Sequence, residues 1–177
     1  MRYFPKITGE RLYLSPMNME DLVIYTKWLN DPAVAIHLGH YKSLISLPNE
    51  QKALEGLTTE GHNYAIIHKD SDQLIGNIGL FDIDHISRRA MLGLFIGDEE
   101  LRGKGYGTEA IRLLLTFGFD TLNMHNVMLQ CDSDNLQGIA CYKKVGFREF
   151  GRRRASAFKH GDYLDTVYMD ILSTEFK

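Results

Sequence analysis

The glycines at positions 103, 105 and 107 carry the clearest chemical signal in the sequence. They stand in the segment LRGKGYGTEAIRLLL, residues 101–115, where an apolar run with helical spacing follows them at once. Backbone N–H groups at the start of a helix are unpaired and carry partial positive charge, so they favour an anion. Glycines let a bulky diphosphate approach that backbone, and Arg102 and Lys104 add charge nearby. The segment therefore predicts a diphosphate site, although a plain strand-to-helix turn would use glycines as well.

Two other phosphate-binding motifs can be compared with this segment. A P-loop requires glycine and lysine followed by serine or threonine, and the sequence contains no such triplet. Gly105, Gly107 and Ala110 satisfy the GxGxxA fingerprint of dinucleotide-binding folds, and Asp132 could bind the ribose. That fingerprint normally opens the first strand–helix unit, whereas here it follows several predicted strands. A dinucleotide site is disfavoured but stays open on these residues alone.

Sequence patterns around the loop predict the elements that must position it. Apolar runs and period-two patterns predict strands at residues 9–16, 62–69, 73–83, 88–97, 126–132 and 162–172. Helical spacing predicts helices at 18–32, directly after the glycines, and at 135–147, while 33–60 is expected to be helix and loop. The arginines at 152–154 are interpreted as a solvated turn. An antiparallel meander followed by a strand–helix–strand–helix unit predicts a mixed α/β, or α+β, fold.

Length and composition limit the class of protein. The chain has 177 residues, 44% hydrophobic and 24% charged, which is typical of a single globular domain over residues 1–177. A net charge of -3 gives no general attraction to nucleic acid, and no apolar run is long enough to span a membrane. Cys131 and Cys141 form neither a disulfide pattern nor a CxxC site, so a soluble, cytoplasmic protein is expected. His37 and His40 lack a third ligand in the sequence pattern, so no metal is expected.

Several segments together resemble the GCN5-related N-acetyltransferases (GNAT). Residues 102–107, RGKGYG, are similar to the R/Q-x-x-G-x-G/A loop that holds the coenzyme A diphosphate in that family. Residues 9–34, 92–111, 132–147 and 160–172 resemble the RimJ/RimL branch, the ribosomal-protein alanine acetyltransferase type. The resemblance implies the GNAT fold, with a central, mostly antiparallel twisted sheet, splayed central strands and flanking helices. It also implies acetyl-CoA as the cosubstrate.

The resemblance indicates which residues bind the coenzyme. The pantetheine arm would insert between the splayed strands and pair with strand backbone near Gly93, a position that fits a bulge or a close approach. The implied coenzyme-binding residues are Leu94, Phe95, Ile96, Arg102, Gly103, Lys104, Gly105, Tyr106, Gly107, Thr108 and Asn135. Asn135 matches the asparagine that contacts the pantetheine arm, and it also fits a helix N-cap. Tyr142 matches the tyrosine that protonates the leaving thiolate, and it is the predicted catalytic residue.

The general base is the point at which the sequence departs from the family. Many relatives have a glutamate two residues before the strand glycine, and here Met91 occupies that position and cannot accept a proton. The pKa of a free α-amino group is about 8 and that of lysine about 10.4, so an α-amine needs less help from a base. This favours an α-amine or a small amine. Together with the RimJ/RimL resemblance, the expected reaction is acetylation of a protein or peptide N-terminal α-amine, by direct attack in a ternary complex.

Acceptor specificity is expected from residues 28–45 and from the hairpin at 160–163, which match family regions flanking the acceptor channel. The expected acceptor-binding residues are Trp28, His37, Tyr41 and Tyr163, although Trp28 also fits a core position. Two other functions stay open. One is acetylation of a small amine, such as a polyamine or an aminoglycoside-like compound, and the other is a coenzyme A-binding regulatory module of weak activity. A homodimer is among the assemblies to be expected.

Overall fold

The computed structural model describes residues 2–39, 42–59 and 61–177. Its N-terminal half contains β1 (Ile7–Thr8), β2 (Leu12–Pro16), η1 (Met19–Asp21), α1 (Leu22–Asn30), α2 (Pro32–Ala35), α3 (Leu47–Thr59), β3 (His62–His68) and β4 (Gln73–Asp84). Its C-terminal half contains β5 (Arg89–Ile96), η2 (Glu99–Leu101), α4 (Tyr106–Thr116), the π-helical turn η3 (Phe117–Thr121), β6 (Asn126–Asp132), α5 (Leu136–Val145), β7 (Arg148–Lys159) and β8 (Asp162–Leu172).

The strands form one eight-stranded sheet in the order β1-β2-β3-β4-β5-β6-β8-β7. Neighbouring strands run antiparallel, except β5 and β6, which run parallel. α4 lies between these two strands in the chain, because a parallel pair needs a long crossover rather than a tight turn. The expected mixed fold, with a mostly antiparallel sheet and flanking helices, is confirmed.

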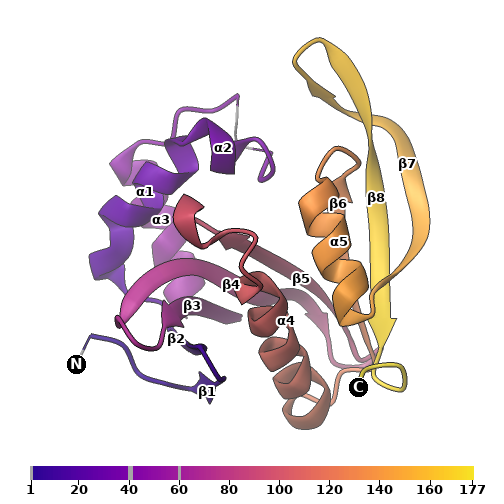
Figure 1. Cartoon of the computed structure of the whole chain (residues 1–177), viewed down its shortest axis with the longest axis horizontal. Helices are drawn as coiled ribbons and strands as arrows, with labels where there is room; N and C mark the ends of the chain where they lie inside the picture. Colours follow the sequence, from indigo (N-terminus) through magenta and orange to yellow (C-terminus); the bar gives the residue numbers. More distant parts are fainter. Residues whose placement is uncertain (1, 40–41, 60) are drawn as a thin grey trace.

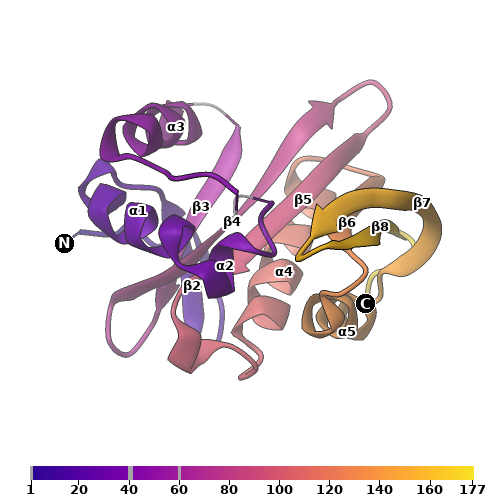
Figure 2. The same cartoon turned by 90° about the horizontal axis from the view of Figure 1, so that it is seen from above.

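Helices cover both faces of the sheet. Side chains alternate between the two faces of a strand. Leu12 and Leu14 of β2 accordingly enter the core that contains Ile111 of α4, whereas Tyr13 enters a second core with Tyr25 of α1. Figure 1 shows α1, α2 and α3 on one side of the molecule and α5 with β6, β7 and β8 on the other. Figure 2 shows the same separation from above, so the two ends of the molecule meet at β5 and β6.

The parallel pair β5 and β6 separates soon after it begins. The two strands are paired over only three positions, the last of which joins Met91 and Met128. β5 then continues beside β4 as far as Ile96, and β6 continues beside β8 as far as Asp132. Each strand therefore keeps one neighbour and loses the other. This is the splay of the central strands that the resemblance implies.

Two strands differ from the sequence expectation. β1 is only two residues long, too short to produce an alternating pattern. The interpretation of residues 152–154 as a turn is wrong, because these arginines lie inside β7 and the hairpin turn comes later, at Gly161. β7 is the edge strand of the sheet, and its register shifts between Arg153 and Ala157. An irregular edge strand exposes most of its side chains, so no apolar alternation marks it in the sequence.

Candidate active site

A cleft of about 940 Å³ lies where β5 and β6 separate. Its walls come from the ends of these strands, the loop before α4, the first turn of α4, α5 along most of its length, and α2. Every coenzyme-binding residue expected from the sequence lines this cleft, and so does Tyr142. Residues that are distant in the chain therefore meet around one opening. Such a volume is within the range of small-molecule and cofactor sites.

The glycine loop has a backbone that other residues would not adopt easily. Gly103 and Gly105 have φ angles of 72° and 88°, and Gly105 is the N-cap of α4. Only glycine takes this left-handed conformation without a steric cost. Gly107 follows within the first turn of the helix, and a Cβ there would lie 3.5 Å from Leu94 Cδ1. The loop thus presents bare backbone at a helix N-terminus, which fits the diphosphate of coenzyme A.

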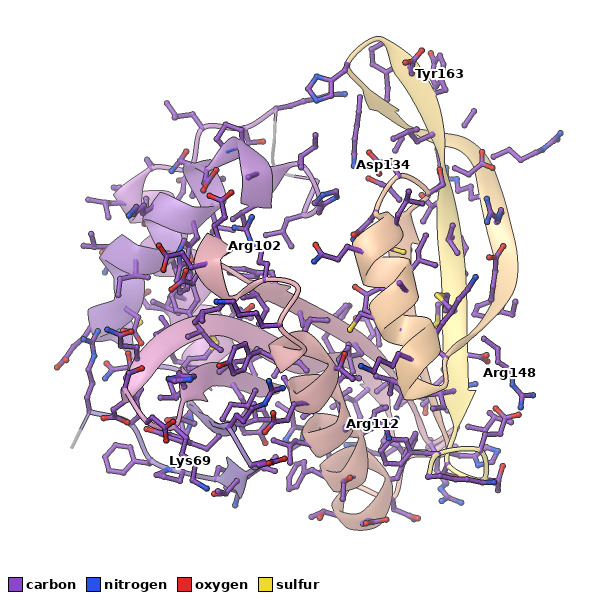
Figure 3. The ribbon with its side chains drawn as sticks, viewed as in Figure 1. Lys69, Arg102, Arg112, Asp134, Arg148 and Tyr163 are labelled. Carbon is purple, nitrogen blue, oxygen red and sulfur yellow. The ribbon has the colours of Figure 1, made fainter. Side chains whose placement is uncertain are left out.

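Arg102 fixes the start of the loop rather than projecting freely. Its Nε donates to the carbonyl of Ile96 (3.0 Å), and its Nη2 donates to the carbonyl of Gly97 (2.9 Å). Figure 3 shows Arg102 where the chain leaves β5. The guanidinium group therefore connects the loop to the end of the strand and keeps a positive charge beside the cleft. This structural role was not foreseen from the sequence.

The β5 wall contributes mainly backbone to the cleft. Leu94 faces the α4 core, and Phe95 points to the other side, where its ring packs edge-on against Tyr25 and Trp28. Gly93 pairs in register with Gly79, so it does not form the bulge suggested by the sequence; the irregularity falls between Phe81 and Asp84. The backbone of β5 beyond Met91 has no β6 partner, and this is where the sequence resemblance would place the pantetheine arm.

The α5 wall carries the predicted acid. Asn135 caps the helix, and its side-chain oxygen accepts from the Gly138 N–H at 3.0 Å. Tyr142 lies two turns further along and is only 9% exposed. Burial is the main cause that raises the pKa of its hydroxyl well above the usual value, and the nearby Cys131 and Cys141 thiols add to it. Tyr142 therefore stays protonated at neutral pH and can donate a hydrogen bond into the cleft.

The acceptor residues predicted from the sequence separate in the structure. His37 lines the cleft. Trp28 does not line it; it is buried against Gly97, where a Cβ would lie 2.1 Å from its ring. Tyr163 is 71% exposed at the tip of the β7–β8 hairpin, where it packs against Phe158 (Figure 3). Tyr41 falls outside the described residues.

One buried charge cluster at the cleft was missed from the sequence. Asp132, at the end of β6, lines the cleft, and Lys159 Nζ lies 2.7 Å from its Oδ2 and 3.2 Å from Asp134 Oδ1. Lys159 is only 3% exposed, so this cluster attaches the β7–β8 hairpin to the end of β6. Lys159 stands at the end of a mostly exposed strand, and no local pattern marks its burial. Asp132 is the one carboxylate among the described residues that line the cleft.

Metal ligands and membrane spans were also sought. Within residues 2–39, 42–59 and 61–177, no group of three or more His, Cys, Asp and Glu side chains is placed to hold a metal ion. None of the helices in that part of the chain combines the length and apolarity that a membrane crossing requires.

Comparisons with known proteins agree with this geometry. The acetyltransferase (GNAT) domain family matches residues 11–148. The chain is 27% identical over 175 residues to the uncharacterized N-acetyltransferase p20 of Bacillus licheniformis, covering 94% of this chain and 96% of that protein. It is 33% identical over 101 residues to the spermidine N(1)-acetyltransferase of Escherichia coli, covering 57% of this chain and 54% of that protein.

A solved structure shares the fold over nearly the whole chain. The spermidine N-acetyltransferase from Vibrio cholerae, in complex with CoA and spermine, superposes with a TM-score of 0.84 at 23% identity, covering 94% of this chain and 98% of that one. With the family match over residues 11–148, these observations agree with the glycine loop, the splayed strands and the cleft between them. The chain belongs to the acetyltransferase (GNAT) domain family and is an acetyl-CoA-dependent N-acetyltransferase.

Proposed function

We propose that the enzyme acetylates the α-amino group of a protein or peptide N-terminus, by direct attack on acetyl-CoA in a ternary complex. The cleft between the separated strands carries this proposal, since it brings the glycine loop, the free β5 backbone and Tyr142 to one opening. The diphosphate binds residues 103–108, and the pantetheine arm lies along β5. The neutral amine nitrogen then bonds to the carbonyl carbon and gives up a proton to solvent water as the C–S bond breaks. The sulfur leaves as a thiolate hydrogen-bonded to Tyr142, or takes its proton, which solvent then replaces.

The charges around the cleft favour an acceptor with a single amine. A polyamine carries several positive charges, and these are normally recognised by unpaired carboxylates. Asp132 is the one carboxylate among the described residues of the lining, and Lys159 already neutralises it. Arg102, Lys104 and Lys144 add positive charge to the lining, which suits coenzyme A phosphates rather than a polycation. Met91 leaves the position of the family glutamate without a base, which favours an amine of low pKa.

Polyamine acetylation is the second candidate. The similarity to the spermidine N(1)-acetyltransferase of Escherichia coli favours it. In that case the acidic groups that bind the polyamine would have to come from outside the described lining of the cleft. The RimJ/RimL resemblance favours the peptide N-terminus instead.

An acceptor panel with a pH profile tests the proposal. Acetyl-CoA turnover should be measured with peptides bearing a free α-amine, the same peptides with a blocked α-amine and a free lysine, and spermidine. For an α-amine, kcat/KM should rise with pH and level off near about pH 8, where that group is deprotonated. For lysine or spermidine it should still rise at pH 9. Turnover confined to spermidine would reject the peptide acceptor and establish the second candidate.

A further inference from the structure

Arg11 contacts the glycine loop and is not among the described residues that line the cleft. It lies in the turn between β1 and β2, and its Nη1 donates to the carbonyl of Lys104 at 2.9 Å. Its Nε and its backbone N–H both donate to the Glu109 carboxylate, at 2.9 and 2.8 Å. Its guanidinium carbon lies 4.6 Å from the centre of the Tyr106 ring. The Arg11 side chain therefore contacts the glycine loop at Lys104, the first residue of α4 at Tyr106, and the first turn of α4 at Glu109.

The backbone of Arg11 is fixed as well. Its carbonyl accepts from the Lys69 N–H at 2.9 Å, and the Lys69 ammonium donates to the carbonyl of Gly9 at 3.3 Å. Lys69 lies in the β3–β4 turn beside β1 (Figure 3). The Tyr106 hydroxyl is in turn 3.1 Å from His68 Nε2. Arg11 thus connects the glycine loop, which pairs with no strand, to the β3–β4 turn at the edge of the sheet.

The contact with the Lys104 carbonyl decides which way the next peptide N–H points. The carbonyl of Lys104 and the N–H of Gly105 belong to one trans peptide, so they point in opposite directions. Because Arg11 holds the carbonyl, the Gly105 N–H points away from Arg11. Gly105 makes rotation of this peptide inexpensive, since the rotation changes the φ of Gly105 and glycine tolerates both signs of φ. Without Arg11 the carbonyl could turn toward the bound diphosphate and repel it.

Glu109 is the second group near the loop that Arg11 contacts. Its carboxylate lies in the first turn of α4, only 16% exposed, close to the loop that receives the diphosphate. An unneutralised carboxylate at that place would oppose an anionic ligand. Arg11 Nε donates to this carboxylate and neutralises it, while Nη1 of the same guanidinium group donates to the Lys104 carbonyl; a planar guanidinium can make both contacts at once in a fixed geometry, and an ammonium cannot.

We propose that Arg11 is a positioning residue for acetyl-CoA: it orients the Lys104–Gly105 peptide and neutralises Glu109, so that the loop is preorganised as an anion site. Arg11 acts through the loop, without a place in the chemistry itself. The inference rests on the proposed binding of the diphosphate at residues 103–108. Its effect is therefore expected on acetyl-CoA affinity and not on the acetyl-transfer step.

The test compares Arg11→Gln, Arg11→Lys and the double variant Arg11→Gln with Glu109→Gln. Arg11→Gln should raise the Kd and KM of acetyl-CoA by about tenfold, the size of one charge-assisted contact, with kcat at saturation within about twofold. Arg11→Lys keeps the positive charge but loses the planar donor geometry of the guanidinium group. Its Kd for acetyl-CoA should therefore lie between those of the wild type and Arg11→Gln. The double variant should recover part of the affinity. Arg89→Gln, which removes an exposed ion pair with Asp84, is the control and should change nothing.

Two results would overturn the inference: unchanged acetyl-CoA affinity in folded Arg11→Gln, or equal losses in acetyl-CoA affinity, acceptor affinity and kcat. If Arg11→Gln does not fold, Arg11→Lys decides, and a wild-type Kd in that variant rejects the role. Gly107→Val separates this inference from the binding proposal. If Gly107→Val weakens binding and Arg11→Gln does not, only the role of Arg11 fails. If neither variant weakens binding, the diphosphate does not bind at this loop.

Discussion

Met91 and Met128 form the last pair in the parallel register of β5 and β6, and the cleft begins directly beyond them. The backbone of β5 after Met91 keeps its bonds to β4 on one side and is free on the other. The same residue that marks the separation also occupies the position where many relatives have a glutamate. The strands therefore part at Met91, a residue whose side chain cannot take up a proton from the acceptor amine.

Filling the space above the glycine loop should weaken acetyl-CoA binding. A Cβ at Gly107 would make ordinary contacts with Leu94 and Cys141, at 3.5 and 3.9 Å, so Gly107→Val should fold. Its branched side chain extends into the cleft, and the Kd of acetyl-CoA, measured by calorimetry, should rise by at least about tenfold. Gly105→Val should show a similar loss together with lower stability, because of the φ of 88°.

The control for this measurement is Gly151→Val in β7, where a Cβ would meet nothing within 4 Å. It carries the same substitution outside the lining of the cleft and should bind acetyl-CoA like the wild type. An unaltered Kd in folded Gly107→Val would show that the diphosphate binds elsewhere.

Local sequence patterns were enough to predict the helices and strands that carry the coenzyme motifs. The glycines, the apolar face of α4 and the cap at Asn135 are each recognised from a few consecutive residues, so β5, α4, β6 and α5 could be predicted in their order. The resemblance added the splay of β5 and β6. The coenzyme-binding residues expected from the sequence all line the cleft, because they stand on these few elements.

Contacts between distant residues could not be predicted in this way. Arg11 and Lys104 are 93 residues apart, and Lys159 reaches Asp134 across 25 residues. Trp28 and Tyr163 have the residue type of an acceptor pocket, but only packing decides that Trp28 is buried under Gly97 and that Tyr163 is exposed at a hairpin tip. Register and tertiary packing, which no short pattern encodes, fix all of these positions.

His37 and Tyr163 should affect different acceptors. His37 lines the cleft, so His37→Ala should raise the acceptor KM by about three- to tenfold for any amine, the size of one hydrogen bond. Tyr163 lies outside the lining and can reach only an acceptor that extends to the hairpin tip. Tyr163→Ala should therefore raise the KM of a long peptide and leave that of a small amine unchanged.

The KM of acetyl-CoA should remain constant in both variants. Phe150→Ala is the matched control for Tyr163→Ala, because it also removes an exposed aromatic ring, in this case from β7. A parallel increase in the KM of acetyl-CoA and of the acceptor in His37→Ala would mean that this segment belongs to the coenzyme site.

Glu50 should make the protein less stable as the pH rises. Burial raises the pKa of its carboxyl, so the folded protein holds this proton more tightly than the unfolded chain. The resulting stabilisation is complete below the unfolded pKa of about 4.3 and is lost as the pH rises through the folded pKa. Glu50→Gln cannot ionise, so its melting temperature should exceed that of the wild type at pH 8 and approach it at about pH 4.

Glu55→Gln is the control for this effect, because Glu55 is exposed on the same helix α3. It should not change the pH dependence of melting. Asp21, whose pKa is also raised by burial, is retained in every variant, so its titration cancels in the comparison. A melting temperature of Glu50→Gln equal to that of the wild type at both pH values would contradict the prediction.

Tyr142→Phe should slow acetyl transfer without weakening acetyl-CoA binding. Since burial keeps its hydroxyl protonated, Tyr142 can donate to the departing sulfur throughout the working pH range. A thiol pKa of about 8.5 makes free thiolate a tolerable leaving group, so the donor helps without being indispensable. The expected loss in kcat is about 10²-fold, the lower end of the range for general acid catalysis. Phenylalanine keeps the edge contact with Phe147, so stability should change little.

Single-turnover acetyl transfer at saturating acetyl-CoA is the decisive measurement, because it reports the chemical step apart from binding and product release. Tyr25→Phe is the matched control, since it also removes a buried hydroxyl, on the opposite face of the sheet. That variant should transfer acetyl at the wild-type rate. If Tyr142→Phe also stays within about twofold of wild type, with chemistry rate-limiting, the tyrosine only packs α5 against the sheet and is not the acid for the leaving thiolate.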